Sequence, residues 1–278
     1  MAQAGPKRPS IVAHRGASDT TPEHTLAAYR QAIEAGTDGL ECDVRLTADG
    51  HLVCVHDRRI ERTSNGRGVL STMKLHELDD LDWGSWKNPW ADLDEEAETP
   101  DADVRSVLTL ERLLEMVRDC GRRVEVAIET KHPTRYAGLV ERRLIETLDR
   151  FGWARPKVGT ESPARVMSFS WLSLRRMRAM APAVRTVLLM DRVPLRFRDG
   201  SLPTGVSIAG PSLEIVTAHP EYVARAQGHG HRVHVWTVNA EEDVRHCLRI
   251  GVDAIITDRP GETLAIVEDH VRGLSERW

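Results

Sequence analysis

Two carboxylates separated by one residue follow a short apolar run in the segment 39–44, Gly-Leu-Glu-Cys-Asp-Val. Successive side chains of a strand point to opposite faces, so Glu41 and Asp43 share one face and Cys42 faces the other. Two anions on one buried face repel each other and lose hydration unless a cation or a proton lies between them. The pattern therefore indicates a site, although an ordinary strand end with solvated or arginine-paired carboxylates is the alternative.

A second charged pair repeats this spacing, because Glu129 and Lys131 flank Thr130. If both segments are neighbouring strands, three carboxylates (Glu41, Asp43 and Glu129) meet without cysteine or clustered histidine beside them. Such a hard oxygen site suits Mg²⁺ or Ca²⁺ rather than zinc. The choice between the two ions depends on cavity size and flexibility, so it stays open.

Two basic residues and two histidines fall at or just after the expected strand ends, close to these carboxylates. Arg15 and Lys131 indicate a substrate that brings its own negative charge, and a phosphate bridging the cation and these side chains would balance the site. His14 and His56 are suited to proton transfer near neutral pH, one removing a proton and the other protonating a leaving oxygen. Lys131 could alternatively serve only as an ion-pair partner for Glu129.

The elements that must position these residues alternate regularly between strand and helix patterns. Strands are expected around Ile11 and Leu40 and then at 124–129, 166–169, 184–190, 206–209, 233–238 and 254–257. Eight such repeats favour a closed α/β barrel, the TIM (β/α)8 fold, over an open sheet. All strand carboxyl ends then lie on one rim, where His14, Glu41, Asp43, Glu129 and Trp236 converge. His229, His231 and His234 precede or begin a strand, so we expect them to be structural and at least the first two to lie on the opposite rim.

The segment 57–107 breaks the alternation and is expected to be a small insertion after the second strand, within a single domain 1–278. Trp83, Trp86 and Trp90 fall close together in it, and they could form a small core or roof a pocket. Residues 92–103 are strongly acidic and indicate a solvated loop. A helix is expected to open at Pro22-Glu23 and to end at Gly36.

Composition limits the function classes. The chain has 278 residues and a formal net charge of −4, which gives no overall basic surface for nucleic acid. Its four cysteines are widely spaced without a CxxC pair, a usage typical of reduced cytosolic thiols. No signal peptide or long uncharged run is visible, so we expect a cytoplasmic protein without stable membrane insertion. Serine-hydrolase, phosphate-loop, zinc-protease and dinucleotide motifs are absent.

An ordered set of motifs spans roughly residues 11–260 and resembles the glycerophosphodiester phosphodiesterase family. The motifs are His14-Arg15-Gly16, Pro22-Glu23-His24-Thr25, Glu41-Cys42-Asp43, His56-Asp57, Ile128-Glu129-Thr130-Lys131, Trp236-Thr237-Val238-Asn239, Gly251-Val252-Asp253 and Thr257-Asp258-Arg259-Pro260. The resemblance implies a barrel with a small insertion after the second strand. It also implies a divalent-metal hydrolase that splits glycerophosphodiesters into glycerol 3-phosphate and an alcohol.

Carried over by position, the resemblance implies roles for eight residues. His14 and His56 would be the acid and base, and Glu41, Asp43 and Glu129 would be the metal ligands. Arg15 and Lys131 would contact the phosphate. Trp236 would form an apolar wall for the glycerol. One residue departs from the family pattern, because His24 stands where the family usually has asparagine. A histidine is bulkier and can titrate, so metal geometry or pH dependence could differ.

Two other functions stay open at this stage. One is lysophospholipase D-like or phospholipase C-like hydrolysis of a lipid phosphodiester, which a larger apolar mouth around the three tryptophans would favour. The other is a non-catalytic phosphodiester-binding barrel, against which the two histidines argue. The leaving alcohol, the attacking group (water or the substrate's own hydroxyl) and the oligomeric state are not determined by the sequence.

Overall fold

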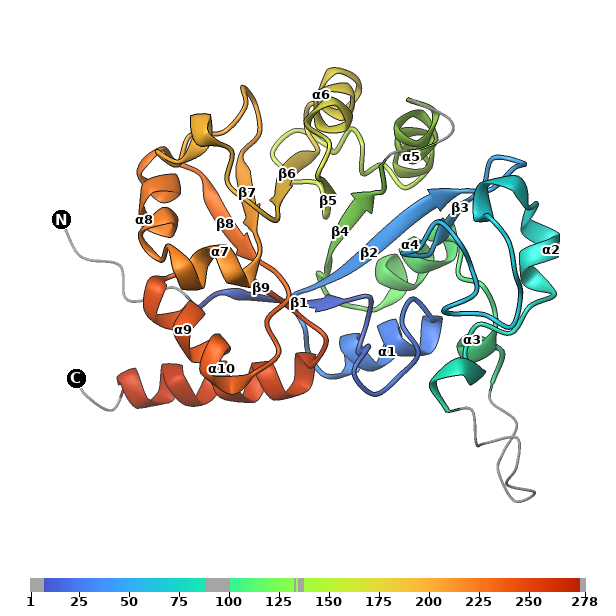
Figure 1. Ribbon diagram of the computed structural model, residues 1–278, viewed down its shortest axis with the longest axis horizontal. Helices are drawn as coiled ribbons and strands as arrows, with labels where there is room; N and C mark the ends of the chain where they lie inside the picture. Colours follow the sequence, from blue (N-terminus) through green and yellow to red (C-terminus); the bar gives the residue numbers. More distant parts are fainter. Residues whose placement is uncertain (1–7, 89–100, 133, 135–137, 276–278) are drawn as a thin grey trace.

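The computed structural model describes residues 8–88, 101–132, 134 and 138–275, and eight parallel strands in this part of the chain close into a barrel (Figure 1). Closure occurs because β1 pairs with both β2 and β9. The barrel strands are β1 (Ser10–His14), β2 (Gly39–Leu46), β4 (Glu125–Thr130), β5 (Ala164–Ser168), β6 (Arg185–Met190), β7 (Ile208–Pro211), β8 (Arg232–Val235) and β9 (Ala254–Thr257). The predicted TIM barrel is therefore confirmed.

Strand β2 shows how the sequence pattern builds the barrel wall. Leu40, Cys42 and Val44 pack outward into the large apolar core between strands and helices. Glu41 and Asp43 take the opposite, inner face, as the alternation predicts. Beyond the barrel rim β2 continues, and the short strand β3 (Leu52–Cys54) pairs with it antiparallel.

The barrel interior holds its own apolar layer, which forms the floor of the carboxyl-end opening. Its members come from six strands and are Val12, Ala127, Met167, Val187, Leu189, Ile208, Ala254 and Ile256. Several side chains that follow these in the same inward positions toward the strand ends are polar, including His14 and Glu129, whereas Phe169 after Met167 is aromatic. The interior is thus a packed core that ends in a polar rim.

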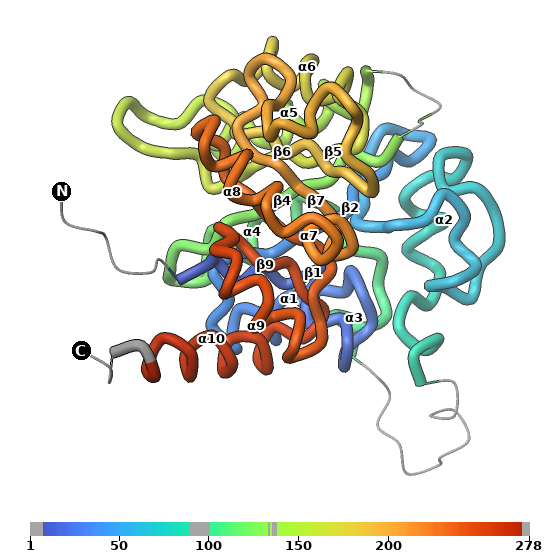
Figure 2. Tube along the Cα trace, turned by 60° about the vertical axis from the view of Figure 1, so that its left-hand side comes forward, coloured from blue at the N-terminus to red at the C-terminus, as the bar shows by residue number. Residues whose placement is uncertain are grey.

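Helices surround the barrel and bury apolar faces against its outer wall. Thr109 and Ser170 cap two of them, accepting hydrogen bonds from the backbone N–H groups of Arg112 and Ser173. Helices α9 and α10 lie side by side in both views (Figures 1 and 2). The helices are α1 (Leu26–Glu34), α2 (Leu75–Asp79), α3 (Ala102–Arg105), α4 (Leu110–Asp119), α5 (Leu139–Arg150), α6 (Trp171–Met180), α7 (Leu213–Ala218), α8 (Glu221–Gly228), α9 (Glu241–Ile250) and α10 (Pro260–Ser275), with short 3₁₀ turns at Leu70–Thr72, Ser85–Lys87 and Leu195–Phe197.

The first helix begins later than the sequence suggests. Helix α1 starts at Leu26 with Thr25 as its N-cap, and its capping hydroxyl accepts a hydrogen bond from the Ala28 N–H. Residues 22–25 are not helical, because His24 has φ +61° and therefore lies in the left-handed region. The expectation of a helix opening at Pro22-Glu23 is wrong for this reason. Helices α2, α3, α7 and α10 were not predicted from the sequence.

Within the segment 57–107, residues 57–88 and 101–107 form a small unit beside the barrel, drawn in cyan to green around α2 and α3 (Figures 1 and 2). Its described part has a separate apolar cluster, in which Trp83 is buried and donates its indole N–H to the Leu78 carbonyl at 2.9 Å. Trp83 is therefore core rather than a pocket roof. Trp90 and most of the acidic run 92–103 lie outside the described residues. Within that run, Asp103 belongs to α3 and pairs with Arg30 and Arg112 rather than lying in a loop.

The sequence led us to expect reduced cysteines and no stable membrane insertion. The four cysteines are free thiols, and Cys42, Cys54 and Cys247 are buried. Across the described residues, none of the helices combines the length and apolar character that a bilayer crossing needs.

Gly16 makes a close approach that a larger residue could not make. It has φ +88°, and a Cβ at this position would lie 2.7 Å from the carbonyl carbon of Ala28 in α1. Gly16→Ala should therefore lower the free energy of unfolding by more than about 2 kcal/mol, through both backbone strain and steric overlap. Gly36→Ala is the control, since Gly36 has φ +91° but open space around it, and about 1 kcal/mol is expected. Equal losses in urea denaturation would contradict the steric argument.

Candidate active site

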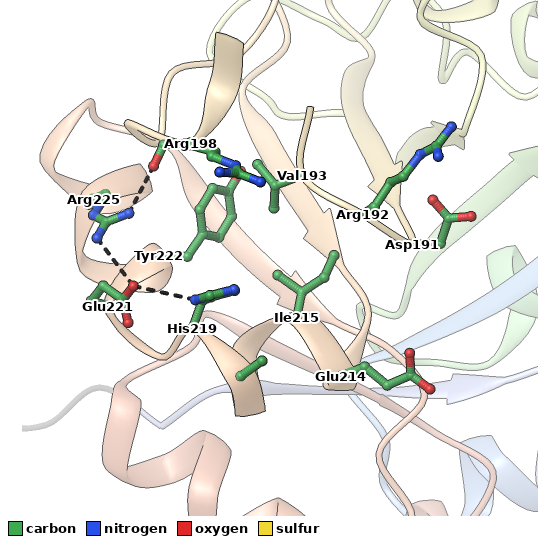
Figure 3. A pocket seen from close by; sticks show the side chains of 11 residues that line it. Asp191, Arg192, Val193, Arg198, Glu214, Ile215, His219, Glu221, Tyr222 and Arg225 are labelled. Carbon is green, nitrogen blue, oxygen red and sulfur yellow. Dashed lines mark hydrogen bonds and ion pairs between the residues drawn. The ribbon is translucent and has the colours of Figure 1, made fainter. Parts of the chain in front are cut away.

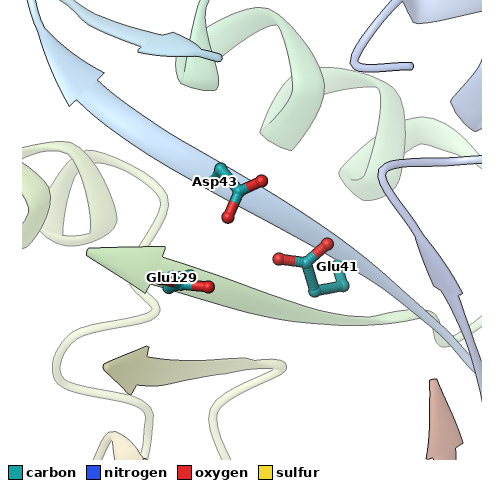
Figure 4. A group of neighbouring side chains, drawn as sticks. All are labelled: Glu41, Asp43 and Glu129. Carbon is teal, nitrogen blue, oxygen red and sulfur yellow. The ribbon is translucent and has the colours of Figure 1, made fainter. Parts of the chain in front are cut away.

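Three carboxylates meet inside the barrel at the carboxyl ends of β2 and β4 (Figure 4). Glu41, Asp43 and Glu129 are only 1%, 1% and 7% exposed, and each offers an oxygen within 4.8 Å of the others. Register explains the meeting, because Asp43 and Glu129 are direct partners on adjacent parallel strands. The predicted convergence of these three side chains is thus present in the structure.

Cationic side chains contact this carboxylate cluster from two sides. The Lys131 ammonium lies 2.9 Å from Asp43 Oδ1 and 2.8 Å from Glu129 Oε1. The Arg15 Nε lies 3.1 Å from Asp43 Oδ2, and the backbone N–H of Arg15 donates to Glu41 Oε2 at 3.1 Å. Asp43 is therefore the best-compensated carboxylate of the three.

His24 is the third side chain that contacts Asp43. Its Nε2 lies 3.0 Å from Asp43 Oδ2, and its Nδ1 lies 2.8 Å from the Tyr29 hydroxyl. The same hydroxyl donates to the Glu41 carbonyl at 3.0 Å. The residue that departs from the family pattern is thus buried and orients a carboxylate of the cluster, with a pKa lowered by burial.

The cluster divides its charge unevenly. Burial alone would raise the pKa of Asp43, but the hydrogen bond with His24 and the charge of Lys131 hold it well below its usual range. Burial and the nearby Asp43 charge raise the pKa of Glu129 to about 7 and that of Glu41 well above its usual range. The group is thus short of positive charge, which a divalent cation bound by these oxygens would supply.

His14 lies at the end of β1 and is held by a network that begins at the end of the neighbouring strand β9. Its Nδ1 lies 2.7 Å from Asp258 Oδ1. Asp258 also accepts hydrogen bonds from the Ser18 hydroxyl at 2.9 Å and the Asn239 amide at 2.7 Å. With Nδ1 engaged, Nε2 faces the carboxylate cluster and lies 3.9 Å from Glu41 Oε2.

His56 is held in the same way by a different carboxylate. Its Nδ1 lies 2.7 Å from Asp57 Oδ1, and Asp57 is also paired with Arg62. Arg62 donates two hydrogen bonds of 2.7 Å to Glu23, which in turn accepts one from Arg15 at 3.0 Å. Burial lowers the pKa of His56 to about 4, so its imidazole is neutral at pH 7.

A pocket of about 140 Å³ collects most of these side chains at the carboxyl-end rim. It is lined by His14, Arg15, Glu41, His56, Glu129, Lys131, Met167, Phe169, Leu189, Trp236, Thr237 and Ile256. The Trp236 indole donates to the Gly210 carbonyl at 2.7 Å and meets Phe169 edge to face at 5.5 Å between ring centroids. One wall of the pocket is therefore aromatic, while the other is charged.

All eight residues singled out from the sequence lie at this rim, Asp43 beside the pocket lining and the other seven within it. Sequence reasoning missed the contribution of Phe169 and the ion-pair chain through Arg62 and Glu23. No local signal exposes such contacts, because they join segments that are distant in sequence. His229 and His231 precede β8 and stack on each other at 6.3 Å, and buried His234 points into the barrel at its amino end, so none of the three joins the site.

The fold and site together define a barrel enzyme whose acidic, basic and imidazole groups face one pocket at the strand carboxyl ends. Residues 14–262 match the family model described as glycerophosphoryl diester phosphodiesterase family. The chain belongs to this family, and it is accordingly an enzyme of the phosphoric diester hydrolase class. The resemblance expected from the motifs is confirmed.

Similar proteins agree with that assignment. The chain is 46% identical over 261 residues to "Probable glycerophosphodiester phosphodiesterase 1" of Mycobacterium tuberculosis, covering 94% of this chain and 93% of that protein. It is 33% identical to a glycerophosphodiester phosphodiesterase of Caldanaerobacter subterraneus, covering 91% and 95%. A crystal structure of a glycerophosphodiester phosphodiesterase from Agrobacterium tumefaciens superposes with a TM-score of 0.72 at 26% identity, covering 92% of this chain and 99% of that one.

Substitution of His24 tests its hydrogen-bonding role. His24→Ala removes both side-chain bonds and keeps the left-handed backbone, so a loss of about 2–4 kcal/mol in unfolding free energy is expected. His24→Asn should lose no more than about 1–2 kcal/mol, because asparagine tolerates positive φ and its amide can donate to Asp43. Guanidinium denaturation measures both. An alanine variant as stable as the natural protein would show that the contacts with Asp43 and Tyr29 contribute nothing.

Proposed function

We propose that this enzyme hydrolyses glycerophosphodiesters to glycerol 3-phosphate and an alcohol, using one divalent cation and histidine acid–base catalysis. The observation that carries the proposal is the arrangement of two histidines, each with Nδ1 held by an aspartate, around a buried cluster of three carboxylates. Family membership supports the reaction class. The cation and the individual roles rest on the geometry.

The carboxylate cluster fits Mg²⁺ or Ca²⁺. Glu41, Asp43 and Glu129 supply hard oxygen ligands close enough to share one ion. The raised pKa values of Glu41 and Glu129 indicate that a bound cation would stabilise their charged forms. When bound, such a cation would neutralise charge on the phosphodiester. Lys131 bridges two of the carboxylates and, with Arg15, is placed to contact the phosphate oxygens.

The two histidines have different surroundings that suit different roles. His56 is neutral at pH 7 and can accept a proton from the attacking group, whether water or the glycerol hydroxyl of the substrate. His14 faces Asp258, whose carboxylate can stabilise a charged imidazolium, so His14 can protonate the leaving oxygen as the phosphorus–oxygen bond breaks. Trp236 forms the aromatic wall that borders the glycerol.

We further propose that 57–107 acts as an inserted cap within one domain spanning 1–278. Two contacts support this, because Arg62 in this segment binds Glu23 and the Lys87 ammonium donates to the Ser18 carbonyl at 2.5 Å. Both partners lie in the loop after β1 that carries Arg15. The segment can therefore influence how the rim is held.

Metal dependence is tested by glycerol 3-phosphate release from a panel of glycerophosphodiesters after chelation and then with Mg²⁺, Ca²⁺ or Mn²⁺ restored. Release should return with a divalent cation in the natural protein. Glu41→Gln should stay inactive at cation concentrations that saturate the natural protein, because a charged ligand is lost. Glu146→Gln, on the exposed face of α5, is the matched control and should behave as the natural protein does. Full metal-restored release by Glu41→Gln would exclude the cluster as the metal site.

The histidine roles make a separate prediction. His14→Ala and His56→Ala should each lower kcat by about 10²–10⁴-fold while the melting temperature stays within a few degrees. His51→Ala is the control, since the His51 side chain is exposed and its Nε2 lies 3.9 Å from Asp49 Oδ2. Steady-state turnover measures the effect. If either site variant retained more than half of the natural kcat, its proposed proton transfer would be wrong.

A further inference from the structure

Large apolar side chains that are exposed gather on one part of the molecule. In the described part of the chain, Phe169 (47% exposed), Trp171 (42%), Leu172 (43%) and Leu195 (78%) all follow the carboxyl ends of β5 and β6. These ends belong to the same rim as the active-site pocket. Exposed apolar residues scattered singly need no explanation, but four that follow two adjacent strands at the rim of a pocket make this rim a candidate contact surface.

The same stretch of chain is strongly basic. Residues 169–198 contain seven arginines and one acidic residue, Asp191, in a chain whose net charge is −4. Three of these arginines, Arg192, Arg196 and Arg198, flank Leu195 on the exposed loop after β6, where Arg192 and Arg198 border a second pocket of about 550 Å³ (Figure 3). Positive charge is therefore concentrated where the exposed apolar side chains are.

Two aromatic contacts show how charge and apolar surface are combined. The Arg175 guanidinium lies over the Trp171 ring at 5.2 Å from its centroid, and Arg196 lies over Phe197 at 4.6 Å. Other arginines of the stretch are engaged elsewhere: Arg176 with Glu141, and Arg185 with Glu161. Arg178 donates to the Thr204 carbonyl at 2.8 Å. Among the described residues, the side chains of Arg192, Arg196 and Arg198 around Leu195 form no hydrogen bond or ion pair, so their charges remain available to a partner.

Phe169 connects this surface to the active site. It lines the catalytic pocket, packs on Trp236 and is still half exposed. The sequence left open whether Trp83, Trp86 and Trp90 form a small core or an apolar mouth, and Trp83 is buried in the apolar cluster of the small unit. The described part of the structure places apolar surface on the β5–β6 side of the opening.

We propose that this basic apolar rim, formed by Phe169, Trp171, Leu172, Leu195, Arg192, Arg196 and Arg198, is a peripheral docking surface for an anionic lipid bilayer. Leucine and aromatic side chains insert shallowly at the headgroup boundary, while arginines contact lipid phosphates. Docking in this way turns the mouth of the pocket toward the membrane. This docking surface would give the proposed catalytic site a membrane partner, so the inference rests on the proposed function. Membrane binding does not itself depend on catalytic turnover and can be measured separately.

The proposal is tested with vesicles of equal parts phosphatidylglycerol and phosphatidylcholine, compared with vesicles of phosphatidylcholine alone. The intact protein should co-sediment with the anionic vesicles only, and 0.5 M salt should release it. Replacing Arg192, Arg196 and Arg198 together by glutamine should weaken partitioning on the order of a hundredfold, because each arginine near an anionic surface contributes roughly a fivefold factor. Leu195→Glu should weaken it by about tenfold or more.

Matched controls separate a specific surface from general charge attraction. Val158→Glu changes a fully exposed apolar residue in the loop before β5, at the opposite rim, and should leave partitioning unchanged. Replacing Arg118, Arg143 and Arg249 together by glutamine removes the same charge from helices elsewhere and should lower partitioning by less than about threefold. Losses equal to those of the rim variants would overturn the proposal.

Folding and the reaction are followed independently. Leu195→Glu should keep the natural melting temperature and the natural turnover of a soluble glycerophosphodiester without vesicles. Absent turnover in the natural protein would count against the proposed function, whereas absent co-sedimentation would count against the docking surface alone. The rim could instead pair with a second copy of the chain. Sedimentation velocity would then show a dimer that Leu195→Glu dissociates, and the natural protein would not bind vesicles. That result would also overturn the proposal.

Discussion

The constraint on which the site depends is the burial of three carboxylates on two adjacent strands. Each anion costs free energy when it leaves water, and neighbours of the same sign add to that cost. The chain compensates with Lys131, Arg15 and His24, all in contact with Asp43. The compensation is incomplete at Glu41 and Glu129, because burial and the nearby Asp43 charge raise the pKa values of both carboxyl groups. Such a costly arrangement is consistent with a functional site, and the family of phosphodiester hydrolases to which the chain belongs is consistent with the proposed cation site here.

Barrel geometry is what makes this cluster possible. Parallel pairing of β2 with β4 aligns Asp43 with Glu129, and pairing of β1 with β2 aligns His14 with Glu41. A shift of one residue in either register would turn these side chains into the outer apolar core. The apolar layer of Val12, Ala127 and their neighbours closes the interior below the cluster. Site geometry therefore depends on the same packing that stabilises the fold.

The sequence predicted those parts of the structure that depend on local pattern. Alternation placed Glu41 and Asp43 on one face, and strand ends placed His14, Glu129 and Trp236 on one rim. Boundaries were missed where backbone conformation departs from propensity, as at His24, whose positive φ delays the start of α1. Contacts between distant segments, such as Phe169 on Trp236 and Arg62 on Glu23, have no local signature. The exposed surface near Leu195 was missed because side-chain exposure follows from tertiary packing rather than periodicity.

The supports of the two histidines differ in a way that bears on their proposed roles. Asp258 contacts His14 and otherwise accepts hydrogen bonds from neutral donors, the hydroxyl of Ser18 and the amide of Asn239. Its negative charge is thus available to stabilise a protonated His14. Asp57 contacts His56 and is also paired with Arg62. Burial, rather than Asp57, lowers the pKa of His56 to about 4, so His56 is the neutral imidazole that the proposed base requires. The proposed division into acid and base therefore follows from the different surroundings of the two histidines, because His14 lies beside an aspartate with neutral donors and His56 is held in a buried position.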